Sequence, residues 1–466
     1  MNHAKGARSM ANERRGDMTQ GNPVRLMIAF AIPMMVGGIF QLMYNMVDTV
    51  VLGRYVGVNA LAAIGATATT VFGIVQVGCA LMNALSVVAA QCFGSGDGER
   101  LRVAVGNSVW LALICGAALG AVGLFGARPL MELLGTPGDI IDGATVYIQI
   151  TCGLVIVQLI YNAVAALLRA IGDSRTPLMF LILCSLLNVA LDLVLVLRFG
   201  MGVEGVAVAT IIAQAVSALL AVVYMFRRYT MLRFSARHLR PDPAMLRSVM
   251  RIGTPMAAQT LMLNVGMMVT TAVINSFGSG TVAAYTVGTK VEQLATVLFS
   301  QVAFSFSVFA AQNFGARRFE RITTGLRSML LLILGMSAVS TLIMFLLGRP
   351  IAAFFVDADT PASVLDSAYN MIRIEAALYG FLGAIWLYNS ALRGIGDAQV
   401  TLISSIVELF AKVGLSLLLS RLFGETGIWF ASPIGWILGL IPSVVRFYGG
   451  KWKRAAGAHE PAPAQS

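Results

Sequence analysis

Long, uninterrupted apolar runs recur along the whole chain and limit what it can fold into. Many exceed the roughly 18 residues that mark a candidate transmembrane helix. Only 12% of the residues are charged, whereas soluble domains contain about 25%. The runs do not alternate in polarity as the strands of a membrane barrel do. We therefore predict an all-α polytopic membrane protein with about twelve transmembrane helices. The predicted spans are 24–50, 59–89, 104–126, 143–168, 177–197, 204–226, 249–275, 281–311, 325–347, 364–392, 400–420 and 427–448.

The basic residues indicate the orientation in the membrane. If both termini lie on one side, the tails and even-numbered loops hold 25 of the 33 Lys and Arg residues, and the opposite loops hold five. Basic residues concentrate in cytoplasmic loops, so we expect both termini in the cytoplasm. The net charge of +11 then reflects topology, and no nucleic-acid partner is expected.

The chain contains an internal repeat. The sequence AQCFG at 90–94 returns as AQNFG at 311–315, and LRAIGD at 168–173 returns as LRGIGD at 392–397. The two offsets are 221 and 224 residues. Each copy holds six predicted spans, an even number, so both copies enter the membrane from the same side. We therefore predict two parallel-repeat six-helix bundles.

The repeat predicts how the chain is divided and what the repeated motif does. The expected parts are a cytoplasmic N-terminal tail (1–23), an N-terminal bundle (24–226), a basic cytoplasmic linker (227–248), a C-terminal bundle (249–448) and a cytoplasmic C-terminal tail (449–466). In each copy, Gly172 or Gly396 is expected to end a helix in the left-handed conformation. Asp173 or Asp397 is then expected to cap the next helix.

Five acidic residues fall inside predicted spans, where a charge costs at least about 2.5 kcal/mol and needs a reason. They are Asp48, Asp192, Glu292, Glu375 and Glu408. The repeat does not duplicate them, because the shift places Thr270 opposite Asp48 and Ser416 opposite Asp192. Residues that break an internal symmetry are poor candidates for generic packing, so we interpret these acids as functional.

Asp48 and Asp192 both fall in the outer half of outward-running spans. Polar residues are expected beside them: Tyr44 and Asn45 one turn from Asp48, Asn188 one turn from Asp192, and Thr210 at similar depth. Two such carboxylates can hold a proton between them, and the same oxygens can instead bind Na⁺. The alternative, that Asp48 only caps the outer end of its span, stays open.

The other three acids lie in the C-terminal copy. Glu292 falls near the middle of its span and Glu375 at comparable depth, where an unpaired acid would attract a cationic cargo. Glu408 and Lys412 are four residues apart and either pair with each other or contribute to the cavity. Lys290 is two residues from Glu292 and therefore points to a different face. The expected cavity residues are Gln41, Asn45, Asn162, Glu292, Glu375 and Glu408.

The first span contains a candidate hinge. Pro33 removes a backbone hydrogen bond, and Gly37 and Gly38 follow one turn later. If the first span bends there, protonation of Asp48, which the same span carries, would be coupled to a change in the shape of the span. A static kink is the alternative interpretation.

These motifs together resemble a known family. The run Pro33, Gln41-x-x-Tyr44-Asn45-x-x-Asp48-Thr49 is similar to the first span of the multidrug and toxic compound extrusion (MATE) family. The repeated AQ motifs, the LR-x-x-GD motifs and Asn188-x-x-x-Asp192 fit the same pattern. The resemblance covers residues 22–448.

The resemblance implies a secondary transporter. It implies export of drug-like, often cationic compounds in exchange for H⁺ or Na⁺ by a bacterial cytoplasmic (inner) membrane protein, which we expect to be a monomer. The residues it ties to cation coupling are Tyr44, Asp48, Asn188, Asp192 and Thr210. The aspartate pair favours the bacterial branch that typically relies on H⁺. We expect no cofactor and no metal ion other than Na⁺ at Asp48 and Asp192, and the sequence has no ATP-binding loop of the G-x-x-x-x-G-K-[ST] type.

Three other functions are weighed against export. A flippase for lipid-linked glycans or lipids would favour a basic cavity for pyrophosphate, whereas acids outnumber bases in the predicted spans. An enzyme would need a nucleophile, metal ligands or histidines at one depth, and the three histidines fall in predicted tails or loops. A channel would need a filter-like loop. The flippase is the main alternative.

Overall fold

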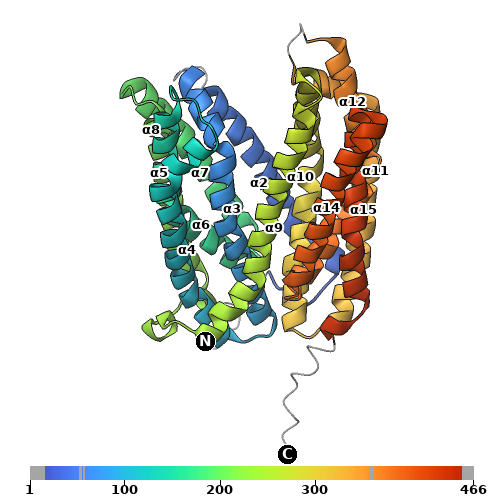
Figure 1. The fold of residues 1–466 in the computed structure, drawn as a ribbon. Coiled ribbons are helices and arrows are strands. Elements are labelled where there is room, and N and C mark those ends of the chain that lie inside the picture. The colour runs from blue at the N-terminus through green and yellow to red at the C-terminus, as the bar shows by residue number, and fades with distance from the viewer. Residues whose placement is uncertain (1–15, 52–54, 56–57, 357–359, 454–466) are drawn as a thin grey trace, which may run out of the picture. The chain divides into compact units, whose positions relative to one another are not determined.

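The computed structural model describes residues 16–51, 55, 58–356 and 360–453, without the side chains of 44–51, 58–61 and 69. Its elements are helices (Figure 1). Within the described residues, ten helices are long and apolar enough to cross a membrane, and two further spans are formed if each of two bent helix pairs counts as one. The predicted fold class, an all-α polytopic membrane protein, is confirmed.

The chain divides into two compact units. The first contains residues 1–21 and 29–260, and the second contains residues 22–28 and 261–466. The divisions therefore fall inside two helices, α2 and α9, rather than in the basic linker. The boundaries predicted for the bundles remain a prediction.

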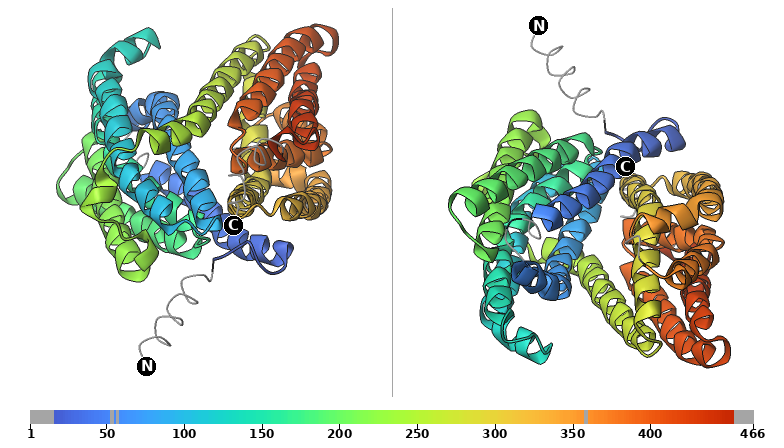
Figure 2. Two further views of the ribbon diagram at one scale, coloured as in Figure 1. Left: turned by 90° about the horizontal axis from the view of Figure 1, so that it is seen from below. Right: turned by 90° about the horizontal axis from the view of Figure 1, so that it is seen from above.

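The N-terminal unit is a helical bundle, which Figure 2 shows along the helix axes. Its helices are α2 (Pro23–Val51, from residue 29), α3 (Val58–Gly94), α4 (Gly98–Leu133), α5 (Ile141–Gly153), α6 (Val155–Ala170), α7 (Arg175–Leu193) with the turn η2 (Val194–Arg198), α8 (Val203–Arg228), the 3₁₀ turns η3 (Thr230–Leu232) and η4 (Ala236–Leu239), and the first part of α9 (Pro243–Asn275). Within it, α3 packs on α4, α5 and α6, and α7 packs on α8. A small apolar core around Met131, Ile148 and Cys152 joins α4 to α5.

The C-terminal unit is a second bundle. Its helices are the rest of α9, α10 (Ser279–Gly315), α11 (Phe319–Ala353), α12 (Ala362–Ala376), α13 (Tyr379–Gly394), α14 (Ala398–Phe423) and α15 (Glu425–Tyr448). Its core is richer in aromatic side chains and includes Phe299, Tyr379 and Trp436. The extensive contact between α14 and α15 holds the last two spans together.

The internal repeat is visible in the helices themselves. Both α3 and α10 contain 37 residues, both α6 and α13 contain 16, and the sixth spans, α8 and α15, contain 26 and 24. Gly172 and Gly396 have φ of 84° and 85°, the left-handed conformation expected after the repeated motif. The sequence prediction for these two glycines is confirmed.

The two repeated aspartates behave differently. Asp173 accepts hydrogen bonds from the backbone N–H groups of Arg175 and Thr176, as predicted for a cap of α7. Asp397 also precedes a helix, but its side chain makes no capping hydrogen bond and instead accepts one from Arg446 Nε at 2.5 Å. The prediction of a side-chain cap is therefore wrong for Asp397, because a nearby guanidinium of α15 binds its carboxylate.

Two predicted spans are not continuous helices. The segment 143–168 is formed by α5 and α6, which meet at 42°, and the segment 364–392 is formed by α12 and α13, which meet at 52°. The breaks follow Gly153 and Ala376 and so occupy corresponding places in the two repeats. Apolar periodicity does not reveal such a bend, because both arms are equally apolar.

Close helix contacts form at one glycine in each unit, Gly116 on α4 and Gly439 on α15. A β-carbon at Gly116 would lie 2.7 Å from Cβ of Ile156, and one at Gly439 would lie 2.9 Å from Cβ of Glu408. Real side chains do not approach so closely, so these positions require glycine. The contact at Gly439 fixes α14 against α15 at the turn that carries Glu408.

Candidate functional site

The N-terminal unit contains a buried polar cluster between α7 and α8. The side chains of Asn188 and Asp192 are each 1% exposed. Asn188 Nδ2 donates a hydrogen bond to Thr210 Oγ1 at 3.3 Å, and Thr210 Oγ1 donates to the carbonyl of Val206 at 3.0 Å. Asn188 Oδ1 has no partner among the described residues. The structure thus brings together Asn188 and Thr210, and places Asp192 one turn further along α7.

The helix changes geometry directly after Asp192. Residues Val194–Arg198 form a turn of π-helix at the end of α7. Such turns are rare and are frequently found at functional sites. The corresponding helix of the other unit, α14, continues as an α-helix from Ala398 to Phe423. The irregular turn therefore accompanies the acid that the repeat does not duplicate.

Tyr44, Asn45 and Asp48 lie on α2, and their side chains are outside the described residues. Their backbone level on α2 can still be compared with that of α7. A β-carbon placed on Gly37 would lie 3.5 Å from the side chain of Leu178 and 3.6 Å from that of Leu181, so α2 contacts α7 there. Asp48 follows Gly37 by eleven residues, and Asp192 follows Leu181 by eleven. Because alternate spans run in the same direction, both acids are carried to a similar level.

The remaining predicted residues of this unit have separate surroundings. Asn162 is half-buried and donates to the carbonyl of Gln158 on its own helix at 2.9 Å, and Gln41 is also half-buried. Pro33 and Gly37 are buried and Gly38 is half-buried, within a helix assigned without interruption from Pro23 to Val51. The cavity role of the first two and the hinge remain predictions.

The C-terminal unit contains a second polar cluster, built by α10, α12 and α14. Glu375 is 3% exposed, and Glu292, Glu408 and Lys412 are half-buried. The ammonium group of Lys412 lies within electrostatic range of all three carboxylates and of the Tyr285 hydroxyl. No carboxylate is within ion-pair distance of Lys412 in the described part of the chain, so its charge is shared rather than bound to Glu408 alone. Lys290 is exposed, as its different helix face predicted.

Aromatic side chains that the sequence analysis did not select surround this cluster. Tyr285 stacks on Trp429 with ring centroids 6.2 Å apart, and Tyr379 is fully buried. Tyr285 precedes Glu292 by seven residues, two helical turns, which is the sequence signal that could have found it. No signal in the sequence placed Tyr379 and Trp429 there, because they come from other helices.

Several buried polar atoms of this cluster have no hydrogen-bond partner among the described residues. They are Glu375 Oε2, the Tyr379 hydroxyl oxygen and Trp429 Nε1. Buried polar atoms are normally satisfied, and exceptions concentrate where a protein binds something. The described residues include no group of three His, Cys, Asp or Glu arranged to hold a metal ion. With three carboxylates and one ammonium group, the cluster can instead attract a diffuse positive charge or take up protons.

Comparison with known proteins identifies the family. The model of the MatE family matches residues 33–194 and again residues 255–418. The second match begins 222 residues after the first, in agreement with the repeat seen in the sequence. Both matched segments contain acids of the clusters described above.

Curated relatives align over nearly the whole chain. The probable multidrug resistance protein YoeA of Bacillus subtilis is 25% identical, and the match covers 92% of this chain and 94% of that protein. The FAD transporter of Shewanella oneidensis is 26% identical, with 88% of this chain and 91% of that protein covered. Relatives of similar identity thus carry names for different cargoes.

Solved structures share the fold. A MOP superfamily transporter from Pyrococcus furiosus superposes with a TM-score of 0.87 at 22% identity, covering 96% of this chain and 99% of that one. At this identity the similarity concerns the arrangement of the helices. It says nothing about the side chains that form the two polar clusters.

Proposed function

The chain belongs to the MatE family of multidrug and toxic compound extrusion transporters, and we propose that it exports amphipathic, often cationic compounds across a bacterial cytoplasmic membrane in exchange for H⁺. Na⁺ is the alternative coupling ion. The observation that carries this proposal is that unrepeated membrane acids are buried among polar side chains in both units: Asp192 near Asn188 in the first, and Glu375 with Glu292 and Glu408 around Lys412 in the second. The family consists of transporters, so we propose transport without a catalysed reaction and without a cofactor.

The N-terminal cluster suits coupling to a small ion. Asp192 is buried one turn from Asn188 on α7, and Asn188, whose Oδ1 is available, donates a hydrogen bond to Thr210. A site made of carboxylate, amide and hydroxyl oxygens binds a proton at its acid or Na⁺ at its oxygens. In this proposal Asp48 adds the second carboxylate, and loading the site changes the shape of α2 near Pro33.

The C-terminal cluster suits an organic cation. A half-buried acid such as Glu292 attracts positive charge, and the stacked rings of Tyr285 and Trp429 offer apolar faces beside it. Cations that are also amphipathic gain from both contacts. A strongly anionic cargo would be repelled, because three carboxylates outnumber the single ammonium group of Lys412.

A transport assay with separate gradients tests the proposal. Proteoliposomes holding the purified protein should move ethidium when a pH gradient is imposed and the Na⁺ concentration is equal on both sides. Transport driven only by a Na⁺ gradient would identify Na⁺ as the coupling ion and would still support the proposal of an exporter. Failure with both gradients would contradict antiport.

An anionic cargo is the second candidate, because one relative of 26% identity is named an FAD transporter. The same vesicles loaded with FAD distinguish the two. FAD movement without ethidium movement would assign this chain to nucleotide export. Movement of a fluorescent lipid-linked glycan between leaflets, with neither of the others, would instead favour the flippase.

The proposed topology has both termini in the cytoplasm and a monomer as the working unit. Reporter fusions that are active on one side of the membrane only, placed at the C-terminus, test the orientation. Light scattering of the purified protein tests the monomer.

A further inference from the structure

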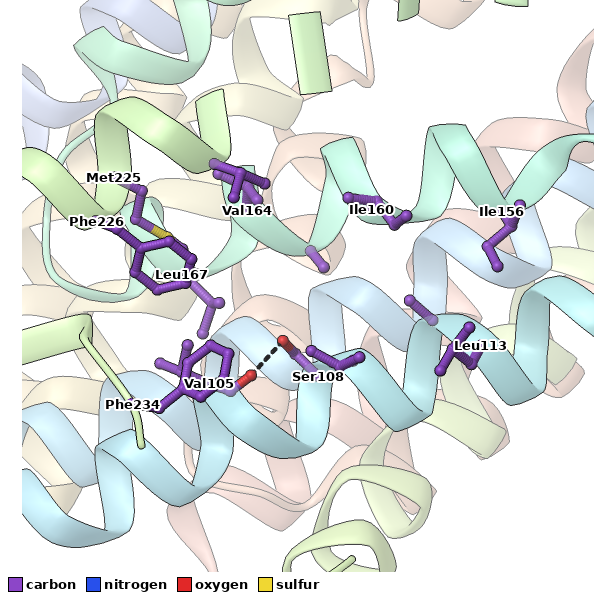
Figure 3. A pocket seen from close by; sticks show the side chains of 14 residues that line it. Val105, Ser108, Leu113, Ile156, Ile160, Val164, Leu167, Met225, Phe226 and Phe234 are labelled. Carbon is purple, nitrogen blue, oxygen red and sulfur yellow. Dashed lines mark hydrogen bonds between the residues drawn. The ribbon is translucent and has the colours of Figure 1, made fainter. Parts of the chain in front are cut away.

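The N-terminal unit has an apolar trough whose lining includes no residue of that unit's polar cluster. It is a cavity of about 260 Å³ lined by fourteen residues of α4, α6, α8 and the segment after α8, as Figure 3 shows. Thirteen of these residues are apolar, and the other is Ser108. The Ser108 hydroxyl already donates to the carbonyl of Val105 at 2.6 Å, so no lining side chain requires a polar ligand.

The trough is long and narrow. Its lining runs along α6 from Ile156 to Leu167, which is about 16 Å at a rise of about 1.5 Å per residue. Its volume lies below the range of about 300–1,000 Å³ that drug-sized ligands occupy. Both features fit a single hydrocarbon chain better than a bulky, compact molecule.

The trough opens to the outside of the unit. Val109, Leu113 and Ile160 line it and are 38%, 43% and 38% exposed. They belong to segments that are long and apolar enough to span a membrane. Exposed apolar surface on such helices faces lipid, so hydrocarbon chains of the bilayer can enter from the side.

One end of the trough is closed by aromatic rings and carries positive charge. Phe226 and Phe234 meet edge to face, with ring centroids 5.4 Å apart. Arg233 holds this end together, because its Nε donates to the carbonyl of Phe226 at 2.6 Å. Arg227 and Arg228, both exposed, directly follow Phe226 at the end of α8. Three arginines therefore lie at the end where the apolar lining stops.

From this juxtaposition we propose that the trough binds one acyl chain of an anionic phospholipid, whose phosphate group is held by the arginines after α8. A chain in the trough contacts α4, α6 and α8 at once and braces the basic segment against them. A zwitterionic lipid would fill the trough equally well but would lack the net charge that the arginines attract.

Native mass spectrometry of the full-length purified protein tests this site with two lipids of identical chains, palmitoyl-oleoyl phosphatidylglycerol and palmitoyl-oleoyl phosphatidylcholine. The wild type should retain one phosphatidylglycerol much more tightly than phosphatidylcholine. Each basic residue near an anionic lipid contributes about a fivefold factor in binding, so Arg227→Gln with Arg228→Gln should weaken phosphatidylglycerol by about 25-fold. The matched control, Lys451→Gln with Lys453→Gln, removes the same charge from the C-terminal unit and should change nothing.

A second pair of variants tests the trough itself. Ala112→Leu adds bulk to a lining residue and should reduce retention of both lipids, while Ala118→Leu, on an exposed face of the same helix, should bind as the wild type does. Equal retention of the two lipids by the wild type would overturn the proposal. So would unchanged phosphatidylglycerol binding in the arginine pair, or in a folded Ala112→Leu protein. Ethidium transport, which depends on the polar clusters, serves as the separate readout of the exporter.

Discussion

Asp192 combines three properties that point to a functional role. It is 1% exposed, it precedes a turn of π-helix, and the repeat replaces it with Ser416. Replacing it with asparagine keeps the shape and removes the ionisable group. Asp192→Asn should therefore fold and insert normally but lose gradient-driven export, measured as ethidium transport in proteoliposomes.

Ser416 provides the matched control for that substitution. It is fully buried at the corresponding position of α14, and Ser416→Ala should transport as the wild type does. Export at the wild-type rate by a well-folded Asp192→Asn protein would remove this acid from the coupling step.

Lys412 sets how negative the C-terminal cluster is. A unit charge at about 10 Å and an effective dielectric constant of about 20 contributes roughly 1.7 kcal/mol. Removing the ammonium group should thus raise the affinity for a permanent cation by roughly 20-fold. We expect Lys412→Gln to bind tetraphenylphosphonium more tightly in a filter-binding assay. Lys412→Arg keeps the charge and should bind as the wild type does, and equal affinities in both variants would argue for a purely packing role.

Glu292 should contribute to the same cluster in the opposite sense. Glu292→Gln removes a half-buried negative charge and is expected to weaken cationic cargo more than neutral cargo of similar size. Transport of one charged and one uncharged dye by the same vesicles measures the difference. Lys290→Gln, two residues away on an exposed face, is the control. Equal loss for both dyes would point to a structural role of Glu292.

At the level of elements, the contact of α4 with α5 depends on glycines that face the bend after Gly153. A β-carbon at Gly123 would lie 2.9 Å from the backbone carbonyl carbon of Cys152, which cannot move aside easily. At Gly126, one turn further, the nearest atoms are 3.6 and 3.8 Å away in flexible side chains. Substitutions at these two positions of one helix therefore allow the effect of close packing to be measured separately from that of helix propensity.

Alanine substitutions should therefore have opposite effects at the two positions. Gly123→Ala overpacks the contact and should cost about 1–3 kcal/mol. Gly126→Ala meets ordinary contacts and gains helix propensity of about 1 kcal/mol. Thermal unfolding of the detergent-solubilised protein should show a lower midpoint for the first variant and an unchanged or higher midpoint for the second. A lower midpoint for both would show that the contact with α5 is not what requires glycine.

At the scale of the whole molecule, the sequence predicted what repeats and what is apolar. Long apolar runs predicted the helical membrane fold, and two motifs that recur at similar offsets predicted the repeat that the helix lengths and the twofold MatE match confirm. The bends after Gly153 and Ala376 were not predicted, because they do not interrupt the apolar pattern. The divisions between the two units, which fall inside α2 and α9, were not predicted either, since they depend on contacts between distant segments.

The candidate sites were predictable to a different degree. Asn188 and Asp192 could be paired from spacing on one helix, and Thr210 from depth in the next. The C-terminal cluster joins residues of three helices, so spacing alone suggested a local pair of Glu408 with Lys412 and missed the wider distribution of its charge. Tyr379 and Trp429 were missed because buried aromatic residues are usually core residues.

The two aspartates of the N-terminal unit provide the sharpest test of coupling. The contact of Gly37 with α7, and equal eleven-residue spacings beyond it, carry Asp48 and Asp192 to a similar level. If they share one cavity, we expect them to titrate as a coupled pair: the first proton removes their repulsion, and the second binds only at lower pH. The first protonation would then let α2 bend near Pro33.

Distance measurements between spin labels on α2 and α7 can follow this change across pH. The wild type should show one transition, and Asp48→Asn should abolish or displace it, because a single remaining acid has no partner to repel. Thr270→Val, at the position of α9 that corresponds to Asp48, is the control and should leave the transition unchanged. The same transition in Asp48→Asn would show that Asp48 is not the sensor. A transition that appears only on adding Na⁺ would still support a coupling site at these two aspartates and would assign sodium as the coupling ion.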